Sequence, residues 1–377
     1  MKVLHLTTHL DPGGITVYIL RLIRLFAQQG IQTFVISSGG SYAPLLKAEG
    51  AQVSDFPIRT KSELHPKIYM ALPRILRFIR ENQIDVIHAH TRVTQVMAFW
   101  IQRCIDIPVV TTCHGFYRRR LGRMLNPAWG DRVIAISEPV GETLAKMHHV
   151  PSAQIRTVPN GIDFAEIDAA YRRHETGTAK VSFGFGREDP VIGIVARLVE
   201  DKGHAFLLRA LVKLKDRFPA MRLLIVGEGK YRKTLEGMIA AKQLQDDVVL
   251  TGNLVDVTRA LAAMDVFVFP AIWKEGFGLS LIEAMACHKP VVAARIWALD
   301  SLIEHEKTGL LVEPRQVAPL VQGVTRFLED TDFRNAICRE ARAMAEQHFS
   351  IERMARKIAE VYHRVQSDRL TGKDSGL

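Results

Sequence analysis

The chain has 377 residues and a formal net charge of +10, with 47% hydrophobic and 24% charged residues. This composition is ordinary for an enzyme of about two domains, and no apolar run approaches the roughly 18 residues of a membrane-spanning helix. The N-terminus reads as a strand without a secretory cleavage site, so we expect a cytoplasmic protein. The cysteines have no metal-ligand spacing, and we expect reduced thiols at Cys104, Cys113, Cys287 and Cys338.

Short β-branched runs alternate with helical patterns along the whole chain. In the first half, buried strands are predicted at 3–6, 33–36, 86–89, 109–112 and 133–136. The pattern restarts after residue 190, with strands predicted at 191–195, 223–226, 248–250, 266–269 and 291–293. Three helices are then predicted at 318–329, 332–348 and 351–365. Strands that alternate with helices form parallel sheets that are covered on both faces.

Two such blocks predict an α/β protein with two doubly wound domains, at 1–168 and 169–350. The polar stretch 172–180 is a plausible connector between them. We expect the helix at 351–366 to pack back on the first domain and residues 367–377 to form a disordered tail. Because ligands of open parallel sheets lie beyond the carboxyl ends of the strands, the active site is predicted in a cleft where the two domains face each other.

Two carboxylates, Glu275 and Glu283, flank a glycine-spaced turn that leads into an apolar helix. Unpaired amides at a helix N-terminus favour anions, so this turn could hold a diphosphate. The helix of Glu283 is apolar nearly all round, and a buried carboxylate needs a partner. Arg197 and Lys202, on another strand-to-helix connection, could neutralise charge that develops as a sugar–phosphate bond breaks. Together these segments predict a nucleotide-sugar site.

Several further motifs follow predicted strands in a fixed order. They are Gly13–Gly14, Asp85–His90, His114–Phe116, Ala135–Glu138, Pro159–Asp163, the Arg197/Lys202 segment, Val226–Gly229 and the Glu275/Glu283 segment. In this order the chain resembles the retaining glycosyltransferases of family 4, whose GT-B fold has two Rossmann-like domains. It departs from the usual family pattern at 296–300, where Gly-Gly is absent, and at Ile15–Thr16, where an acidic residue is common.

The resemblance implies a role for each matching residue. Glu275 contacts the transferred sugar, Glu283 accepts hydrogen bonds from the ribose hydroxyls, and His114 points its ring or carbonyl at the sugar. Base contacts come largely from backbone on loops such as 252–254. The resemblance thus assigns catalysis to His114, Arg197, Lys202 and Glu275, and donor binding to Gly14, Arg197, Lys202, Leu254, Glu275, Phe277, Gly278, Leu279 and Glu283.

The same resemblance implies front-face substitution, in which the leaving phosphate deprotonates the acceptor hydroxyl. No cofactor and no metal are required on this interpretation. Asp330 and Asp332 have the Asp-x-Asp spacing that another glycosyltransferase fold uses for metals. They lie between two predicted helices, however, where Asp332 is most simply an N-cap.

Positive charge is concentrated in the first part of the chain. Residues 1–165 hold 19 Lys/Arg against 11 Asp/Glu, and the segments 67–80 and 116–125 mix arginines with large apolar residues. Such mixtures can lie on an anionic membrane surface. The alternative is a solvated basic face whose apolar residues Ile75, Leu76 and Ile79 pack on the sheet. Nucleic acid is not expected, because no recognition motif is present.

The predicted function is transfer of a sugar, with retention, from a UDP- or GDP-sugar to a glycan or lipid-linked acceptor. Synthesis of lipopolysaccharide, capsule or another cell-envelope glycan is the expected context, with possible peripheral membrane attachment. One alternative is a non-catalytic GT-B scaffold. The other is an NAD(P)-dependent oxidoreductase, although Gly227–Arg232 lacks the third glycine of the dinucleotide fingerprint. The donor base, the sugar and the acceptor stay open.

Overall fold

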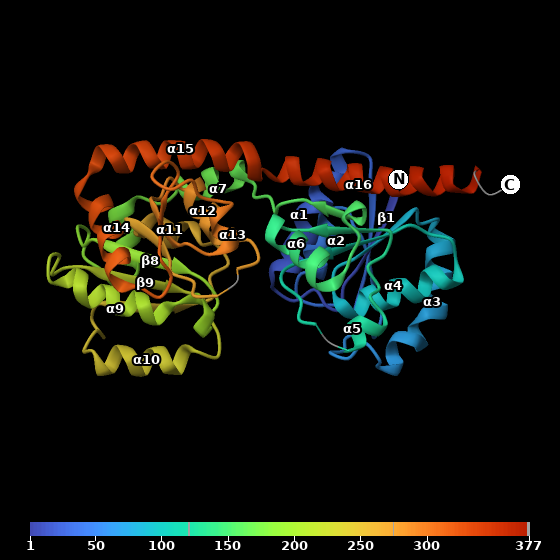
Figure 1. Ribbon diagram of the computed structural model, residues 1–377, viewed down its shortest axis with the longest axis horizontal. Coiled ribbons are helices and arrows are strands. Elements are labelled where there is room, and N and C mark those ends of the chain that lie inside the picture. The colour runs from blue at the N-terminus through green and yellow to red at the C-terminus, as the bar shows by residue number, and fades with distance from the viewer. Residues whose placement is uncertain (120, 274, 375–377) are drawn as a thin grey trace. The chain divides into compact units, whose positions relative to one another are not determined.

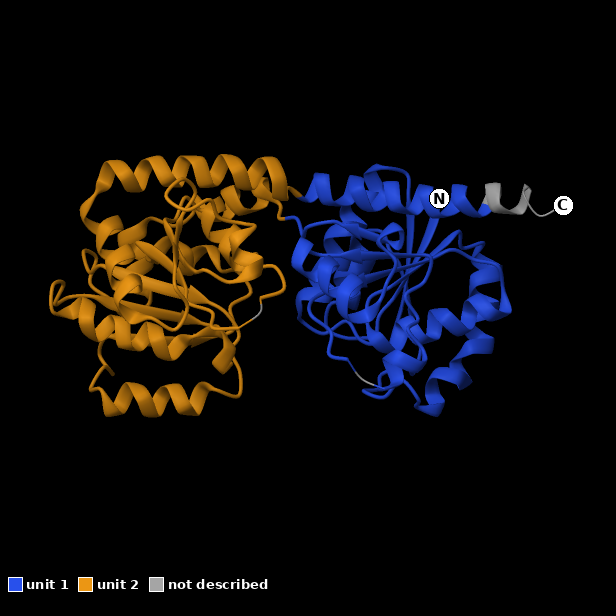
Figure 2. Ribbon diagram, in the orientation of Figure 1, with its two compact units in different colours: residues 1–161, 351–377 blue, residues 162–350 orange. Residues whose placement is uncertain are grey.

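A computed structural model describes residues 1–119, 121–273 and 275–374. The chain forms two compact units, shown in two colours in Figure 2. Unit 1 comprises Met1–Gly161 together with Ile351–Leu377, and unit 2 comprises Ile162–Ser350. Each unit is a parallel sheet with helices on both faces (Figure 1), which confirms the predicted α/β fold class with two doubly wound domains. Arg120, part of the predicted basic segment 116–125, lies outside the described residues.

Unit 1 contains a seven-stranded parallel sheet of order β3-β2-β1-β4-β5-β6-β7. Its strands are β1 (Lys2–Leu6), β2 (Gln32–Ser37), β3 (Gln52–Asp55), β4 (Val86–Ala89), β5 (Val109–Cys113), β6 (Arg132–Ala135) and β7 (Ile155–Thr157). Its helices are α1 (Gly14–Gln28), α2 (Ala43–Ala48), α3 (Pro66–Asn82), α4 (Arg92–Cys104), α5 (Leu121–Leu125), α6 (Glu138–His148), the 3-10 turn η1 (Ser152–Gln154) and α16 (Ile351–Asp374).

Alternate residues of the central strands of unit 1 enter two separate cores. Val3 and Val35 pack in one core with α1 and α16. Leu4 and Phe34 pack in the other core, under α3 and α4. Because successive strand residues point to opposite faces, a strand buried on both faces has no polar side, as the continuous apolar runs predict.

Unit 2 contains a six-stranded parallel sheet of order β10-β9-β8-β11-β12-β13. Its strands are β8 (Val191–Val195), β9 (Arg222–Val226), β10 (Val248–Gly252), β11 (Val266–Phe269), β12 (Val291–Ala294) and β13 (Leu310–Val312). Its helices are α7 (Phe164–Tyr171), α8 (Thr176–Ser182), η2 (Glu200–Lys202), α9 (His204–Lys215), α10 (Arg232–Ala241), α11 (Thr258–Ala263), α12 (Leu279–Ala286), α13 (Trp297–Asp300), α14 (Val317–Glu329) and α15 (Thr331–Phe349).

The limits of the two units differ from the predicted limits in three places. The predicted boundary at 168/169 falls inside α7, which packs on α11 and α12 and therefore belongs entirely to unit 2. The predicted connector 172–180 is partly helical, since α8 contains Lys180, whose buried ammonium lies 2.9 Å from an Asp265 carboxylate oxygen. Helix α16 packs on α1 and β5 and continues to Asp374, beyond the predicted start of a disordered tail at 367.

Three strands are absent from the prediction, namely β3, β7 and β13. Each lies at the edge of its sheet and has only three or four residues. Edge strands are buried less completely, and β3 and β7 accordingly lack the fully buried pattern of the central strands. No helix among the described residues is long and apolar enough to cross a membrane.

Candidate functional site

The loops at the carboxyl ends of β8, β9 and β11 in unit 2 are tied together through their backbones. The Leu198 amide donates to the Glu228 carbonyl at 2.9 Å, and the Ile272 amide donates to the Asp201 carbonyl at 2.9 Å. Residues 196–203 therefore form the centre of a small platform, with the β9 loop on one side and the β11 loop on the other. This is the edge of a parallel sheet at which ligands bind in doubly wound folds.

Two glycines permit this close approach. Gly203 has φ of 74°, and a Cβ at this position would lie 1.8 Å from the Pro270 carbonyl oxygen. Gly227 has φ of 139°, and a Cβ there would lie 2.0 Å from the Ala196 carbonyl oxygen. Positive φ with backbone at such a distance leaves glycine as the residue that fits. The close approach of the platform loops therefore depends on the absence of a side chain at Gly203 and Gly227.

Lys202 and Glu275 form an ion pair on this platform, although 73 positions separate them in the chain. Their side chains are 16% and 15% exposed, so the pair is screened only partly by solvent. The ammonium also lies 5.2 Å from the centroid of the Phe269 ring at the end of β11. The second Glu275 oxygen accepts a hydrogen bond of 3.0 Å from the Gly276 amide. The structure thus brings together two predicted site residues of opposite charge.

The turn after Glu275 delivers the chain into α12. Gly278 is the N-cap with φ of 96°, and Leu279 is the first helical residue. The first amides of any helix lack an intrahelical acceptor, so they are available to an anion. The Phe277 side chain is only 4% exposed and packs edge-to-face on Phe349 at 5.6 Å. Phe277 can therefore offer a ligand its backbone, while its ring anchors the turn.

The remaining predicted residues of unit 2 lie on the same edge of the sheet. Arg197 is exposed on the turn after β8, and its guanidinium makes no hydrogen bond or ion pair within the part of the chain that the structure describes. Glu283 is half-buried on α12, whereas Leu281, Ile282, Ala284, Met285 and Ala286 are buried. Leu254 is half-buried in the loop after β10. The burial predicted for this helix is confirmed, but Glu283 itself occupies its less buried side.

Gly14 and His114, the two predicted residues of unit 1, follow β1 and β5. Gly14 is the exposed first residue of α1, and a Cβ there would meet nothing within 4 Å. The fold itself therefore does not require glycine at position 14. His114 is half-buried, and its ring lies edge-on to Tyr18 at 4.9 Å.

His114 belongs to a histidine network that the sequence prediction did not identify as a unit. His114 Nε2 lies 3.3 Å from His90 Nδ1, and His90 Nε2 lies 3.0 Å from His5 Nδ1. Burial lowers the pKa of His114 and of His5 to about 3, so both rings are neutral at neutral pH. A neutral imidazole carries one N–H, and the three rings therefore donate in one direction along the network.

His88 extends this network toward the C-terminal helix. Its ring nitrogens lie 2.6 Å from the Tyr362 hydroxyl of α16 and 2.6 Å from the Thr112 hydroxyl. One nitrogen from each of His5, His88 and His90 lies within 4.8 Å of the others, a spacing that could hold a metal ion. An ion there would have to replace hydrogen bonds that these rings already make. Both ring nitrogens of His88 and of His90 already have hydrogen-bond partners, which gives these two rings a structural role.

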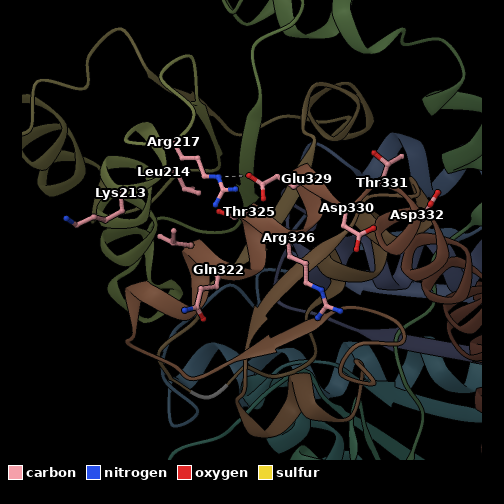
Figure 3. Close-up of a pocket in the computed structure, with 11 residues that line it drawn as sticks. Lys213, Leu214, Arg217, Gln322, Thr325, Arg326, Glu329, Asp330, Thr331 and Asp332 are labelled. Carbon is pink, nitrogen blue, oxygen red and sulfur yellow. Dashed lines mark ion pairs between the residues drawn. The ribbon is translucent and has the colours of Figure 1, made fainter.

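The acidic pair Asp330 and Asp332 lies elsewhere in unit 2. An Asp330 carboxylate oxygen accepts a hydrogen bond of 2.9 Å from the Phe333 amide, so Asp330 is the N-cap of α15. The prediction that Asp332 is the cap was therefore wrong by two positions, because Asp332 lies inside the first turn. Both residues line a cavity of about 860 Å³ between the ends of α9 and α14 (Figure 3). These helix ends lie at the edge where the strands begin, opposite the platform of Lys202 and Glu275.

Comparisons with known proteins match both halves of the chain. The model of Glycosyltransferase Family 4 matches residues 12–166, and the model of Glycosyl transferases group 1 matches residues 176–344. The uncharacterized glycosyltransferase MJ1607 of Methanocaldococcus jannaschii is 26% identical, and the match covers 96% of this chain and 98% of that protein. Matches to glycosyltransferases over both halves disfavour the oxidoreductase alternative.

Solved structures show the same architecture. A glycosyltransferase from Rickettsia africae is 22% identical with a TM-score of 0.87, over 97% of this chain and 98% of that chain. The Anabaena protein Alr3699/HepE, solved in complex with UDP, is 23% identical with a TM-score of 0.80, over 97% of this chain and all of that one. Two matching family models, and two parallel-sheet units shared with these structures, identify the chain as a family 4 glycosyltransferase with the GT-B fold.

Proposed function

We propose that the enzyme transfers a sugar from a nucleotide diphosphate donor, a UDP- or GDP-sugar, with retention and without a metal. The observation that carries this proposal is the Lys202–Glu275 pair beside the N-terminus of α12. A cation, a carboxylate and free amides on one platform suit a ligand that has both phosphate and hydroxyl groups. The Anabaena protein of the same fold was solved with UDP-glucose as well as with UDP, which supports this donor class.

Each residue on the platform has a distinct task in the proposed reaction. Lys202 and Arg197 stabilise the negative charge that grows on the diphosphate as the sugar–phosphate bond breaks. Glu275 accepts hydrogen bonds from the sugar hydroxyls and stabilises positive charge near the anomeric carbon. The leaving phosphate accepts the proton of the acceptor hydroxyl, which then attacks from the same face.

The other predicted residues of the site hold the donor and the sugar. Glu283 accepts hydrogen bonds from the ribose, and the amides of Phe277, Gly278 and Leu279 bind the diphosphate. Leu254 offers its backbone to the base. In unit 1, His114 contacts the transferred sugar as a neutral group, and Gly14 lets the start of α1 approach the ligand.

A thermal-shift comparison of nucleotides tests the donor class. UDP or GDP should raise the melting temperature of the wild-type chain, and NAD(P) should not. Lys202→Ala should lose most of the nucleotide-induced shift. An unchanged shift in Lys202→Ala would show that the nucleotide binds away from this platform. Turnover that is unaffected by a chelator would support the metal-free reaction, and loss of turnover that added metal restores would refute it.

We also propose that unit 1 binds an anionic membrane surface that presents a lipid-linked acceptor. In α3, Ile75 and Ile79 pack in the core as the alternative interpretation requires, while Arg74, Arg77 and Arg80 are exposed. Large apolar side chains are nevertheless exposed near the start of α3, at Leu64 and Met70, and in α5, at Leu121, Met124 and Leu125. A membrane location would suit synthesis of a cell-envelope glycan such as lipopolysaccharide or capsule.

The two parts of this surface are held together by Arg92. Its guanidinium pairs with Glu63, next to Leu64, and donates to the Gly122 and Asn126 carbonyls around α5 at 3.3 and 2.6 Å. Each basic residue near an anionic bilayer contributes about 1 kcal/mol of attraction. Vesicle flotation with anionic lipid should therefore recover the wild-type chain and much less of Leu121→Asp/Leu125→Asp. Equal recovery of the two proteins, or no recovery of either, would refute membrane binding by this surface.

A further inference from the structure

All the excess positive charge of the chain belongs to unit 1. Residues 1–161 and 351–377 hold 25 Lys/Arg against 14 Asp/Glu, whereas residues 162–350 hold 25 against 26. Part of this excess lies far in sequence from the arginines of α3 and α5. Arg132, Arg156, Lys357 and Arg364 line a hollow of about 230 Å³ between α16 and the edge of the sheet. We call this hollow the α16 pocket.

The α16 pocket follows from strand register and helix periodicity. Arg156 pairs with Ile134 in the parallel ladder of β6 and β7, and Arg132 is two residues before Ile134. The two arginines therefore project from the same face of the sheet. That face is covered by α16, as the packing of Ile134 with Met354 and Tyr362 in one core shows.

One side of α16 completes the pocket. Lys357 and Arg364 are seven residues apart, with Glu360 and Val361 between them at helical spacing. Residues at this spacing lie on one side of a helix. Cations from a sheet and from a helix, distant in sequence, therefore converge on one hollow. Figure 1 shows α16 lying across unit 1, where it packs on α1.

The cations of the α16 pocket are poorly neutralised. Arg132 pairs with Asp368, but its Nε is buried and has no hydrogen-bond partner in the described residues. Arg156 donates to the carbonyl of its neighbour Ile155 at 2.9 Å. Within the described part of the chain, the side chains of Lys357 and Arg364 make neither a hydrogen bond nor an ion pair.

Mutual repulsion among these groups is visible in the pKa of Arg156. Burial lowers this pKa, and the nearby Arg364 and Arg132 lower it further. Arginines on an edge strand can serve simply to prevent sheet-to-sheet association. Prevention of sheet-to-sheet association needs only exposed charge on the edge strand. In the α16 pocket, cations of the sheet and of α16 share one hollow although they repel each other.

We propose that the α16 pocket binds the phosphate group of a small soluble molecule. Four cations against Glu360 and Asp368 leave two positive charges, which a phosphate dianion would neutralise. Three guanidinium groups can donate paired hydrogen bonds to phosphate oxygens. The volume is below the roughly 300–1,000 Å³ of pockets for drug-sized ligands, which suits a phosphate with a small attached group.

The lining also argues for a soluble ligand over a lipid. Val158 and Val361 are its apolar members, and both are buried. None of the exposed large hydrophobic residues among the described ones lines this pocket. An acyl chain would therefore find no apolar surface at its rim. The site is independent of the proposed donor platform, which lies entirely in unit 2.

Titration calorimetry with inorganic phosphate, at constant ionic strength and on the full chain, tests the proposal. The wild type should bind one phosphate, and Arg156→Gln/Arg364→Gln should weaken binding by at least roughly tenfold because two charge-assisted donors are lost. Lys47→Gln/Lys146→Gln removes the same charge from exposed positions of unit 1 and should bind normally. Lys202→Ala should also bind phosphate normally.

Melting curves separate loss of the site from loss of the fold. Without phosphate, Arg156→Gln/Arg364→Gln should melt no lower than the wild type, because like charges have been removed. Phosphate should raise the melting temperature of the wild type and leave that of this variant unchanged. The proposal is refuted if the wild type shows no saturable binding, or if the double variant binds as tightly as the wild type. It is also refuted if Lys202→Ala alone abolishes binding, which would place the anion on the donor platform.

Discussion

Replacement of Lys202 by alanine is the sharpest test of the proposed chemistry. Lys202 is held by Glu275 and by the Phe269 ring, on a platform whose backbone is closed by Gly203. The ammonium is therefore positioned before the donor arrives, which is the condition under which a fixed charge stabilises a transition state most. Loss of one such donor typically lowers kcat about 10²–10³-fold, or roughly 3–4 kcal/mol. We expect Lys202→Ala to fall in this range.

The effect of Lys202→Ala on folding should be much smaller than its effect on turnover. The two side chains are about one-sixth exposed, so Glu275 left alone keeps some contact with water and its hydrogen bond from the Gly276 amide. We expect a loss of about 1 kcal/mol in the free energy of unfolding, typical of a partly solvated pair. Chemical denaturation measures this loss, and single-turnover kinetics with the identified donor measure the chemical step.

Lys213→Ala provides a matched control for this experiment. Lys213 is an exposed lysine of the same unit that lines the cavity at the opposite edge of the sheet. Its replacement should leave both turnover and stability within about twofold and 0.5 kcal/mol of the wild type. If Lys202→Ala retained turnover within about threefold of Lys213→Ala, Lys202 would not stabilise the leaving group and the proposed mechanism would be wrong.

Three further predictions concern stability. Because burial lowers the pKa of His5 to about 3, below its ordinary value of 6.5, the unfolded chain takes up a proton first as the pH falls. The contribution of His5 to the free energy of unfolding should therefore be fully present above pH 6.5 and should fall below that pH by up to about 1.4 kcal/mol per pH unit. Urea unfolding at pH 7 and 5 should show a smaller loss of stability in His5→Phe than in the wild type. An identical loss in the two proteins would contradict this assignment. Gly203→Ala should lower the free energy of unfolding by at least about 2 kcal/mol, because φ is positive and the new Cβ would lie 1.8 Å from the Pro270 oxygen. If this variant melted at the same temperature as the wild type, the loop would be free to move away. Arg342 donates to both Asp168 oxygens at 2.7 and 2.9 Å and to the Ala286 carbonyl. Arg342→Ala should therefore lower the free energy of unfolding by about 2–3 kcal/mol. If Arg342→Lys were as stable as the wild type, the bidentate contact would not be needed.

The central strands and the chemistry-bearing turns could be predicted from residues alone. Apolar runs such as 191–195 and 266–269 are buried strands because both their faces are covered, and this leaves an unmistakable composition. The short edge strands β3 and β7 escaped prediction because partial exposure removes that signal. Strand β13 is buried, but its three residues are too few to form a recognisable apolar run. The N-cap of α15 was misplaced for a different reason. Asp330 and Asp332 are both acceptable N-cap residues by type, so the sequence does not distinguish them.

Local pattern by itself determined the α/β class, the order of strands and helices, and which turns carry cations and carboxylates, because those properties depend on neighbours within a few residues. Tertiary structure alone decided that Lys202 meets Glu275, that His114 joins His90 and His5, and that Arg156 and Arg364 share one hollow. Each of these meetings joins residues between 24 and 208 positions apart, and depends on strand register and on which face a helix covers. Such contacts arise from the packing of whole layers, and no short stretch of sequence encodes that packing.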